Sequence, residues 1–107
     1  MPITISGKEK EYTFQGLYSS TSSLNDNSGV YAILSARNEH YYLLDVGEAG
    51  EVKKRVETHD RKDCWERNMN GGAFRCAVYY TPNLQQEGRR RIEKDIRDNN
   101  STPCGTF

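Results

Sequence analysis

The sequence predicts an α+β fold, with a small, mainly antiparallel three-stranded sheet flanked by helices in the order β-β-α-α-β-α. Three observations predict this fold. Two apolar runs, at residues 29–34 and 41–46, lie on either side of a polar turn, as in a β-hairpin. A third apolar run covers residues 74–80. The apolar side chains of residues 84–98 recur every four positions, which is typical of a helix with one buried face.

The N-terminal part of the chain is more polar than the rest. We assign residues 1–28 to an N-terminal leader and residues 29–107 to the domain that contains the predicted elements. Within the leader, residues 11–14 alternate weakly and can form a short edge strand, whereas residues 19–28 are rich in Ser, Asn and Asp and predict a loop. Both hairpin strands are apolar on both faces, so we expect the sheet to be covered on both sides.

Helices are predicted on either side of the third strand. Gly47 and Gly50 end the hairpin, and residues 51–59 predict a helix with acidic residues near its start, where they favour the helix dipole. Residues 61–67 predict a short second helix. The longest helix covers residues 84–98, and its buried stripe consists of Leu84, Gly88, Ile92 and Ile96.

Composition and cysteine content limit the classes of protein. The chain has 107 residues, the size of one domain, with fifteen basic and fifteen acidic residues, so any binding of phosphate must come from a local patch. The three cysteines, Cys64, Cys76 and Cys104, match no metal-ligand spacing. We find no signal peptide and no apolar run long enough to span a membrane. We therefore expect a soluble cytoplasmic protein with reduced thiols and no membrane partner.

Several short motifs follow one another in a specific order, and together they resemble the GIY-YIG nuclease domain. Gly29-Val30-Tyr31 opens the hairpin, and Asp45-Val46-Gly47 ends it. The later motif residues are Arg55, His59 and Glu93, followed by the closing segment Pro103-Cys104-Gly105. The resemblance covers about residues 29–105 and agrees with the predicted elements.

The resemblance implies hydrolysis of DNA phosphodiester bonds with one divalent ion, Mg²⁺ or Mn²⁺. It implies that Tyr31 activates water, that Arg55 contacts the scissile phosphate, and that Glu93 binds the metal. His59, four residues after Arg55 on the predicted helix, would assist as a donor or acceptor.

Two residues depart from the family pattern. Asp45 stands where the family has the tyrosine of its second motif, and Gly105 stands where it has a closing asparagine. We consider two roles for Asp45: it joins Glu93 as a second carboxylate around the metal, or it pairs with Arg55 and partly neutralises it.

Each candidate also has a purely structural interpretation. Tyr31 can be a buried strand residue, and Arg55 can belong to a solvated charged face with Lys53 and Lys54. Glu93 can pair with Arg89 or Arg97 at helical spacing. The basic candidates for contact with a nucleic-acid backbone are Lys53, Lys54, Arg89 and Arg90.

A second class of function fits the same residues. The zero net charge, Asp45 and Gly105 favour a module that binds nucleic acid or a protein partner without catalysis. The small size also fits a toxin or regulatory subunit. The sequence indicates no oligomeric state.

Overall fold

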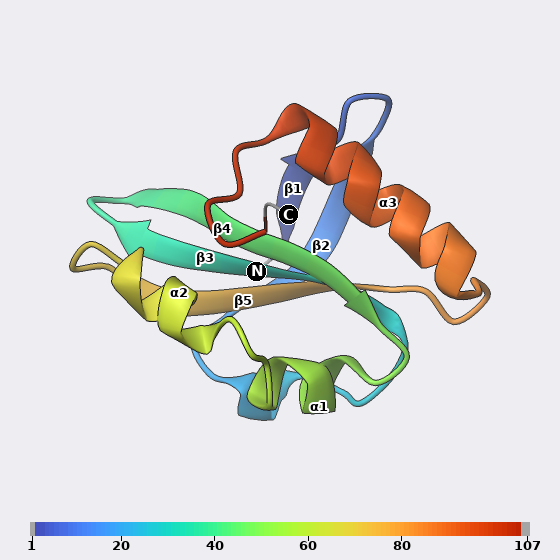
Figure 1. Ribbon diagram of the computed structural model, residues 1–107, viewed down its shortest axis with the longest axis horizontal. Coiled ribbons are helices and arrows are strands. Elements are labelled where there is room, and N and C mark those ends of the chain that lie inside the picture. Colours follow the sequence, from blue (N-terminus) through green and yellow to red (C-terminus); the bar gives the residue numbers. More distant parts are fainter. Residues whose placement is uncertain (1, 106–107) are drawn as a thin grey trace.

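A computed structural model describes residues 2–105 as one antiparallel sheet with helices against it (Figure 1). The sheet has five strands, in the spatial order β1-β2-β5-β3-β4. The strands are β1 (Ile3–Ser6), β2 (Glu11–Tyr18), β3 (Gly29–Arg37), β4 (His40–Ala49) and β5 (Ala73–Tyr80). The helices are α1 (Val52–Glu57), α2 (Lys62–Arg67) and α3 (Gln86–Asn99), with a short 3-10 helix η1 (Thr21–Ser23) before β3.

The prediction of a three-stranded sheet is wrong, because the leader supplies two more strands. β2 pairs with β5, placing Gln15 opposite Val78, and β1 pairs with β2. Tyr12 and Phe14 are buried while their neighbours along the strand are exposed, so β2 presents one apolar face to the core. Both rings pack against Tyr79, with centroid separations of 5.6 and 5.8 Å. The apolar surface of β5 thus has β2 beside it, of which the sequence predicted only residues 11–14, as a short edge strand, whereas β2 lies between β1 and β5.

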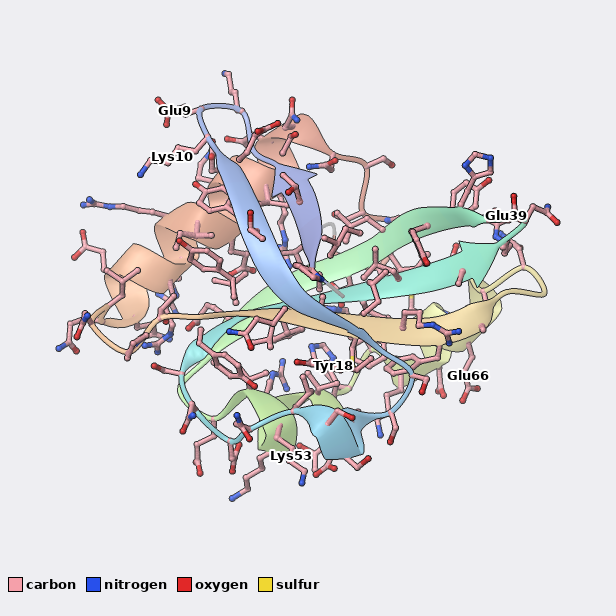
Figure 2. The ribbon with its side chains drawn as sticks, turned by 180° about the vertical axis from the view of Figure 1, so that it is seen from behind. Glu9, Lys10, Tyr18, Glu39, Lys53 and Glu66 are labelled. Atoms are coloured by element: carbon pink, nitrogen blue, oxygen red, sulfur yellow. A yellow bond between two sulfur atoms is a disulfide. The ribbon has the colours of Figure 1, made fainter. Side chains whose placement is uncertain are left out.

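The expectation that both faces of the sheet are covered is confirmed. On one face, Val30, Ala32 and Leu34 of β3 pack in a cluster with Ile96 of α3. On the other, Tyr31 and Ile33 pack with residues of α1 and α2, namely Val52, Val56 and Trp65. The charged side chains labelled in Figure 2 lie at the periphery of the molecule, away from these two clusters.

A β-bulge in the hairpin decides which face Asp45 occupies. Leu34 lies opposite Leu43, but Ile33 lies opposite Asp45, so Leu44 is an extra residue in β4. Residues directly opposite each other share a face of the sheet. The bulge therefore places Asp45 on the face of Ile33, and Gly47 opposite Tyr31 on that same face.

The C-terminal tail returns to the edge of the sheet and overturns the expectation of reduced thiols. The N–H of Cys104 donates to the carbonyl oxygen of Leu44 at 2.9 Å. This brings Cys104 to Cys64 of α2, with the Cα atoms 5.7 Å apart, and the two form a disulfide. Cys76 is buried and unpaired. None of the described helices is long and apolar enough to cross a membrane.

Candidate active site

Tyr31 lies in the middle of the sheet, with its phenol against Gly47. Its side chain is buried, and β3 and β4 place it directly opposite Gly47. A Cβ atom at position 47 would overlap the phenol oxygen and its ring carbons. The Tyr31 ring can therefore pack over the backbone of β4 only because residue 47 has no side chain.

His59 forms a buried pair with Tyr31. The Tyr31 Oη and His59 Nε2 atoms are 2.7 Å apart, and the backbone N–H of Arg61 donates to His59 Nδ1 at 3.0 Å. A neutral imidazole has one donor and one acceptor nitrogen. Because Nδ1 accepts, Nε2 carries the proton and donates to the phenol oxygen. The phenolic proton of Tyr31 is then available for a different acceptor.

Arg55 and His59 were predicted to lie four residues apart on one helix, but only Arg55 lies in α1. α1 ends at Glu57, so His59 lies beyond the helix, in the connection to α2. Its side chain is fully buried, whereas the Arg55 side chain is 41% exposed and forms an ion pair with Asp60 at 3.5 Å. Such a surface pair is weak, so the Arg55 guanidinium can exchange Asp60 for a phosphate.

Burial and nearby charges shift the pKa values of this pair in opposite directions. Burial raises the pKa of Tyr31 to about 12; the negative charge of Asp45 adds to this shift, Arg55 and Arg61 oppose it, and Glu93 raises it further. Burial lowers the pKa of His59 to about 4, assisted by the positive charges of Arg55 and Arg61. At neutral pH the pair is therefore a protonated phenol and a neutral imidazole, and charges from β4, α1 and α3 act on it.

Glu93 of α3 is the more accessible of the two candidate metal ligands. Its side chain is 17% exposed, and its Oε1 forms an ion pair with Arg97 Nη2 at 3.0 Å. This is one of the two helical ion pairs that the structural interpretation of Glu93 predicted. Burial raises the pKa of Glu93, and the charge of Arg97 opposes that shift. Arg89, the other expected partner, pairs instead with Glu48 at 3.0 Å.

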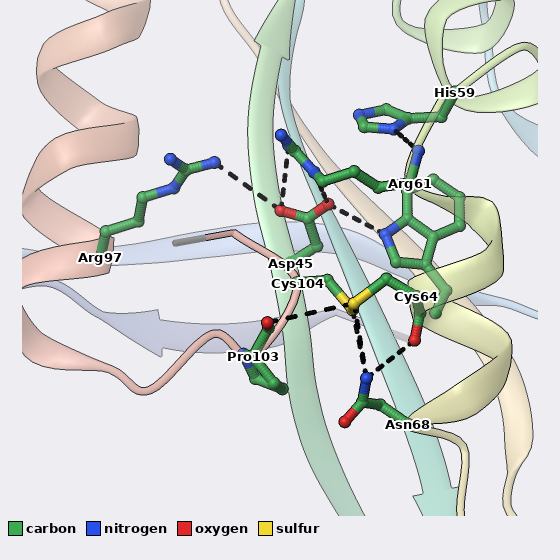
Figure 3. Close-up of a disulfide and its surroundings, with 9 residues drawn as sticks. Asp45, His59, Arg61, Cys64, Asn68, Arg97, Pro103 and Cys104 are labelled. Carbon is green, nitrogen blue, oxygen red and sulfur yellow. Dashed lines mark hydrogen bonds and ion pairs between the residues drawn. A yellow bond between two sulfur atoms is a disulfide. The ribbon is translucent and has the colours of Figure 1, made fainter. Parts of the chain in front are cut away.

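Asp45 is fully buried among donors, in a group that we call the Asp45 cluster (Asp45, Arg61, Trp65 and Arg97) (Figure 3). Its Oδ2 accepts from Arg61 Nε and Trp65 Nε1, each at 2.9 Å. Its Oδ1 accepts from Arg61 Nη2 at 3.3 Å and lies 3.7 Å from Arg97 Nη2. The Arg97 guanidinium also donates to the Val46 carbonyl oxygen.

This arrangement bears on both roles considered for Asp45. Arg61 and Arg97, rather than Arg55, are its cationic partners. The same Nη2 atom of Arg97 also contacts Glu93, so the Arg97 guanidinium lies between the carboxylates of Asp45 and Glu93. A metal ion shared by these two carboxylates would have to occupy the same place. Asp45 therefore does not fit a ligand set with Glu93.

A single-carboxylate metal site remains compatible with the chain. Among residues 2–105, no three His, Cys, Asp or Glu side chains are grouped so that they could hold an ion. Mg²⁺ often binds through one or two carboxylates together with substrate phosphates and water. Glu93 fits such a site, with the remaining ligands coming from substrate and solvent.

The four basic candidates for nucleic-acid contact are not equivalent. Lys53 and Lys54 lie on α1, and Lys54 is exposed. Arg90 of α3 has a side chain that is 66% exposed. Arg89 is 12% exposed and held by Glu48, so it is less available to a phosphate.

Arg61 and Trp65 were not among the site residues predicted from the sequence. The sequence does carry one signal that Asp45 needs hydrogen-bond donors, because a carboxylate within an apolar strand requires donors when it is buried. That signal does not identify the donors, which lie 16, 20 and 52 residues further along the chain. Comparison with protein-family models, curated proteins and solved structures found no match to this chain.

Proposed function

We propose that the protein hydrolyses DNA phosphodiester bonds with one divalent ion, in the manner of the GIY-YIG nucleases that its motifs resemble. The observation that carries this proposal is the buried Tyr31–His59 pair, 2.7 Å apart, on which the charges of Arg55 and Glu93 act. A strongly shifted pair of titratable groups, surrounded by charges of both signs, is typical of a reactive site.

Tyr31 is the proposed proton-transfer group. Its oxygen accepts from His59 Nε2–H and retains capacity for a second hydrogen bond, from the attacking water. As the water attacks phosphorus, one of its protons passes to the phenol oxygen and the phenolic proton passes to a phosphate oxygen. The P–O bond to the leaving sugar oxygen breaks, and that oxygen takes up the transferred proton and leaves as the alcohol. This relay needs no stable phenolate, which agrees with a Tyr31 pKa of about 12.

Arg55 and Glu93 have complementary roles in this proposal. Arg55 offers a planar fork of donors to the phosphate oxygens. Glu93 would hold the Mg²⁺ or Mn²⁺ ion, and Arg97 fixes the orientation of the Glu93 carboxylate. When bound, the ion would supply Lewis acidity and neutralise charge on the phosphate.

A nicking assay on supercoiled plasmid, with Mg²⁺ or Mn²⁺, tests the proposal. We expect the wild-type protein to nick the plasmid and Glu93→Gln to reduce the rate at least 100-fold. Glu87→Gln is the matched control, because Glu87 lies on the same helix, is 80% exposed and pairs with Arg91 at the same i,i+4 spacing. Equal nicking by Glu93→Gln and wild type would reject the role of Glu93.

A binding module without catalysis is the second candidate. Asp45 supports it, because its oxygens are engaged within the Asp45 cluster and an ionised carboxylate cannot donate as the family's tyrosine does. This candidate expects salt-sensitive DNA binding with no nicking under any divalent ion.

The expected cytoplasmic location stays a prediction. The Cys64–Cys104 disulfide weighs against it, because disulfides persist mainly in oxidising compartments.

A further inference from the structure

Two adjacent tyrosines on β4 are unusually exposed for their size. Tyr41 is 49% exposed and Tyr42 is 40% exposed, whereas Tyr12 and Tyr31 are buried. Successive residues of a strand point to opposite faces, so the two rings lie on either side of β4, the outer strand of the sheet. The proposed hydrolytic site does not use these two tyrosines.

A groove of about 410 Å³ lies beside these rings. Its other walls include Arg37 of β3, Asn68 and Asn70 after α2, and Asn100 after α3. No acidic side chain from the described part of the chain lines it. The grooves along α3, in contrast, are lined by Asp95 or Asp98.

The polar groups of this groove are held in place by internal contacts. The Arg37 guanidinium lies 3.9 Å above the Tyr42 ring, and its Nε is buried without a hydrogen-bond partner among residues 2–105. Asn68 Nδ2 donates to the Cys64 carbonyl oxygen at 2.8 Å, and its amide oxygen points away from the disulfide (Figure 3). Asn100 Nδ2 donates to the Ser6 and Ile96 carbonyl oxygens. Both amides thus keep an oxygen to accept from a ligand.

We infer that this groove binds an unpaired nucleotide of a single-stranded nucleic acid. Exposed aromatic rings stack on bases, and a guanidinium fixed on a ring extends that platform. Amide oxygens accept from the N–H groups of base edges, which are accessible only when the base is unpaired. A lining with a cation and no carboxylate is compatible with a polyanionic strand.

The position of the groove relative to Tyr31 gives the inference a geometric consequence, which rests on the proposed function. Tyr42 and Gly47 lie opposite Ser35 and Tyr31, which are four residues apart on β3, or about 14 Å along the strand. A stacked nucleic-acid strand rises about 3.4 Å per nucleotide. The bound base would lie about four nucleotides from the scissile phosphate, so we expect a substrate with a single-stranded segment of that length beside the cleaved bond.

Fluorescence anisotropy with a labelled single-stranded 12-mer of mixed sequence tests the inference. We expect the double variant Tyr41→Ala/Tyr42→Ala to bind about 5- to 150-fold more weakly than wild type, which is the range measured for loss of one stacked base. Leu84→Ala is the matched control, because Leu84 is an apolar side chain of similar exposure, 41%, two residues before α3 and outside the groove. Circular dichroism checks that all variants are folded.

A second probe separates base stacking from charge attraction. A 12-mer with the same backbone but abasic sites should bind wild type and the double variant equally weakly. Equal affinity of wild type and double variant for the intact 12-mer overturns the inference, as does equal affinity of wild type for the intact and abasic strands. Either result would mean that the groove does not bind a base by stacking.

The same two assays distinguish failure of the nucleotide groove from failure of the proposed hydrolase. Glu93→Gln should lose nicking and keep its affinity for the 12-mer. Nicking by wild type with no difference between the two probes rejects only the nucleotide groove. Binding that depends on Tyr41 and Tyr42 without nicking rejects only the hydrolase.

Discussion

Tyr31 and Asp45 lie on neighbouring strands and on the same face of the sheet, but their surroundings differ in kind. Both oxygens of Asp45 are engaged by donors from Arg61 and Trp65, with Arg97 close by. Tyr31 shares one buried hydrogen bond with His59, in which the Tyr31 oxygen accepts, so the phenolic proton is not used by this bond. A satisfied ionic cluster is typical of a structural role, and a shifted pair with spare hydrogen-bonding capacity is typical of a reactive one. Substitutions in the two regions should therefore affect different properties.

Tyr31→Phe should produce the largest change, in activity. The variant keeps the ring but removes the proposed proton relay, so we expect nicking to fall by 10²- to 10⁴-fold. Its free energy of unfolding should fall by about 1–3 kcal/mol, because His59 Nε2–H loses its buried acceptor. Nicking rates and urea denaturation measure the two effects. A rate within fivefold of wild type would contradict the relay.

Asp45→Ala should produce the largest change in stability. It leaves the Arg61 and Arg97 guanidinium groups and the Trp65 N–H without their shared acceptor, so we expect the free energy of unfolding to fall by about 3–5 kcal/mol. Asp60→Asn is the control, because Asp60 is 78% exposed. Similar stability of the two variants would show that the Asp45 cluster is not structural.

A decrease in pH should weaken the fold through His59. The pKa of His59 is about 4 in the folded protein and about 6.5 in an unfolded chain. Between these values the unfolded chain binds more protons, so stability is retained above pH 6.5 and lost as the pH falls towards 4. We expect a loss of about 2 kcal/mol between pH 7.5 and 5.

His59→Gln isolates this contribution, because glutamine does not titrate. Denaturation of both proteins at the two pH values should show a smaller loss for the variant. An equal loss in both proteins would mean that other groups cause the pH dependence.

Asp60→Asn should have the smallest effect and would sharpen the assignment of Arg55. Removing the charge breaks the exposed Arg55–Asp60 pair, which contributes at most about 1 kcal/mol. With Arg55 more available to phosphate, we expect the KM for DNA to decrease by up to about fivefold, as measured by nicking at several plasmid concentrations. An increase in KM would indicate that Asp60 positions Arg55 for the substrate.

The sequence predicted the elements whose apolar pattern is local. The helices and β5 lie within two residues of their expected bounds, and β3 and β4 each end three residues beyond theirs, because their apolar side chains recur over short distances. For β2 only residues 11–14 were predicted as strand, and β1 was missed, because the alternation is weak and the partner β5 lies about sixty residues away.

The site shows the same limit. The motifs singled out Tyr31, Arg55 and Glu93 as candidates, and charges from Arg55 and Glu93 act on Tyr31 in the structure, while the roles of these residues stay a prediction. The environment of Asp45 was not predictable, because it depends on the bulge at Leu44 and on distant donors. The disulfide likewise joins cysteines forty residues apart that only the folded tail brings together.

The covalent link between Cys64 and Cys104 encloses β5, α3 and the connection between them in one closed ring of chain. A protease that cut the exposed turn at Pro82–Gln85 would therefore not release a fragment. The nicked molecule would migrate intact in a gel without reductant and separate into two pieces only after reduction. The part of the chain that contributes Glu93 would therefore stay attached after such a cut.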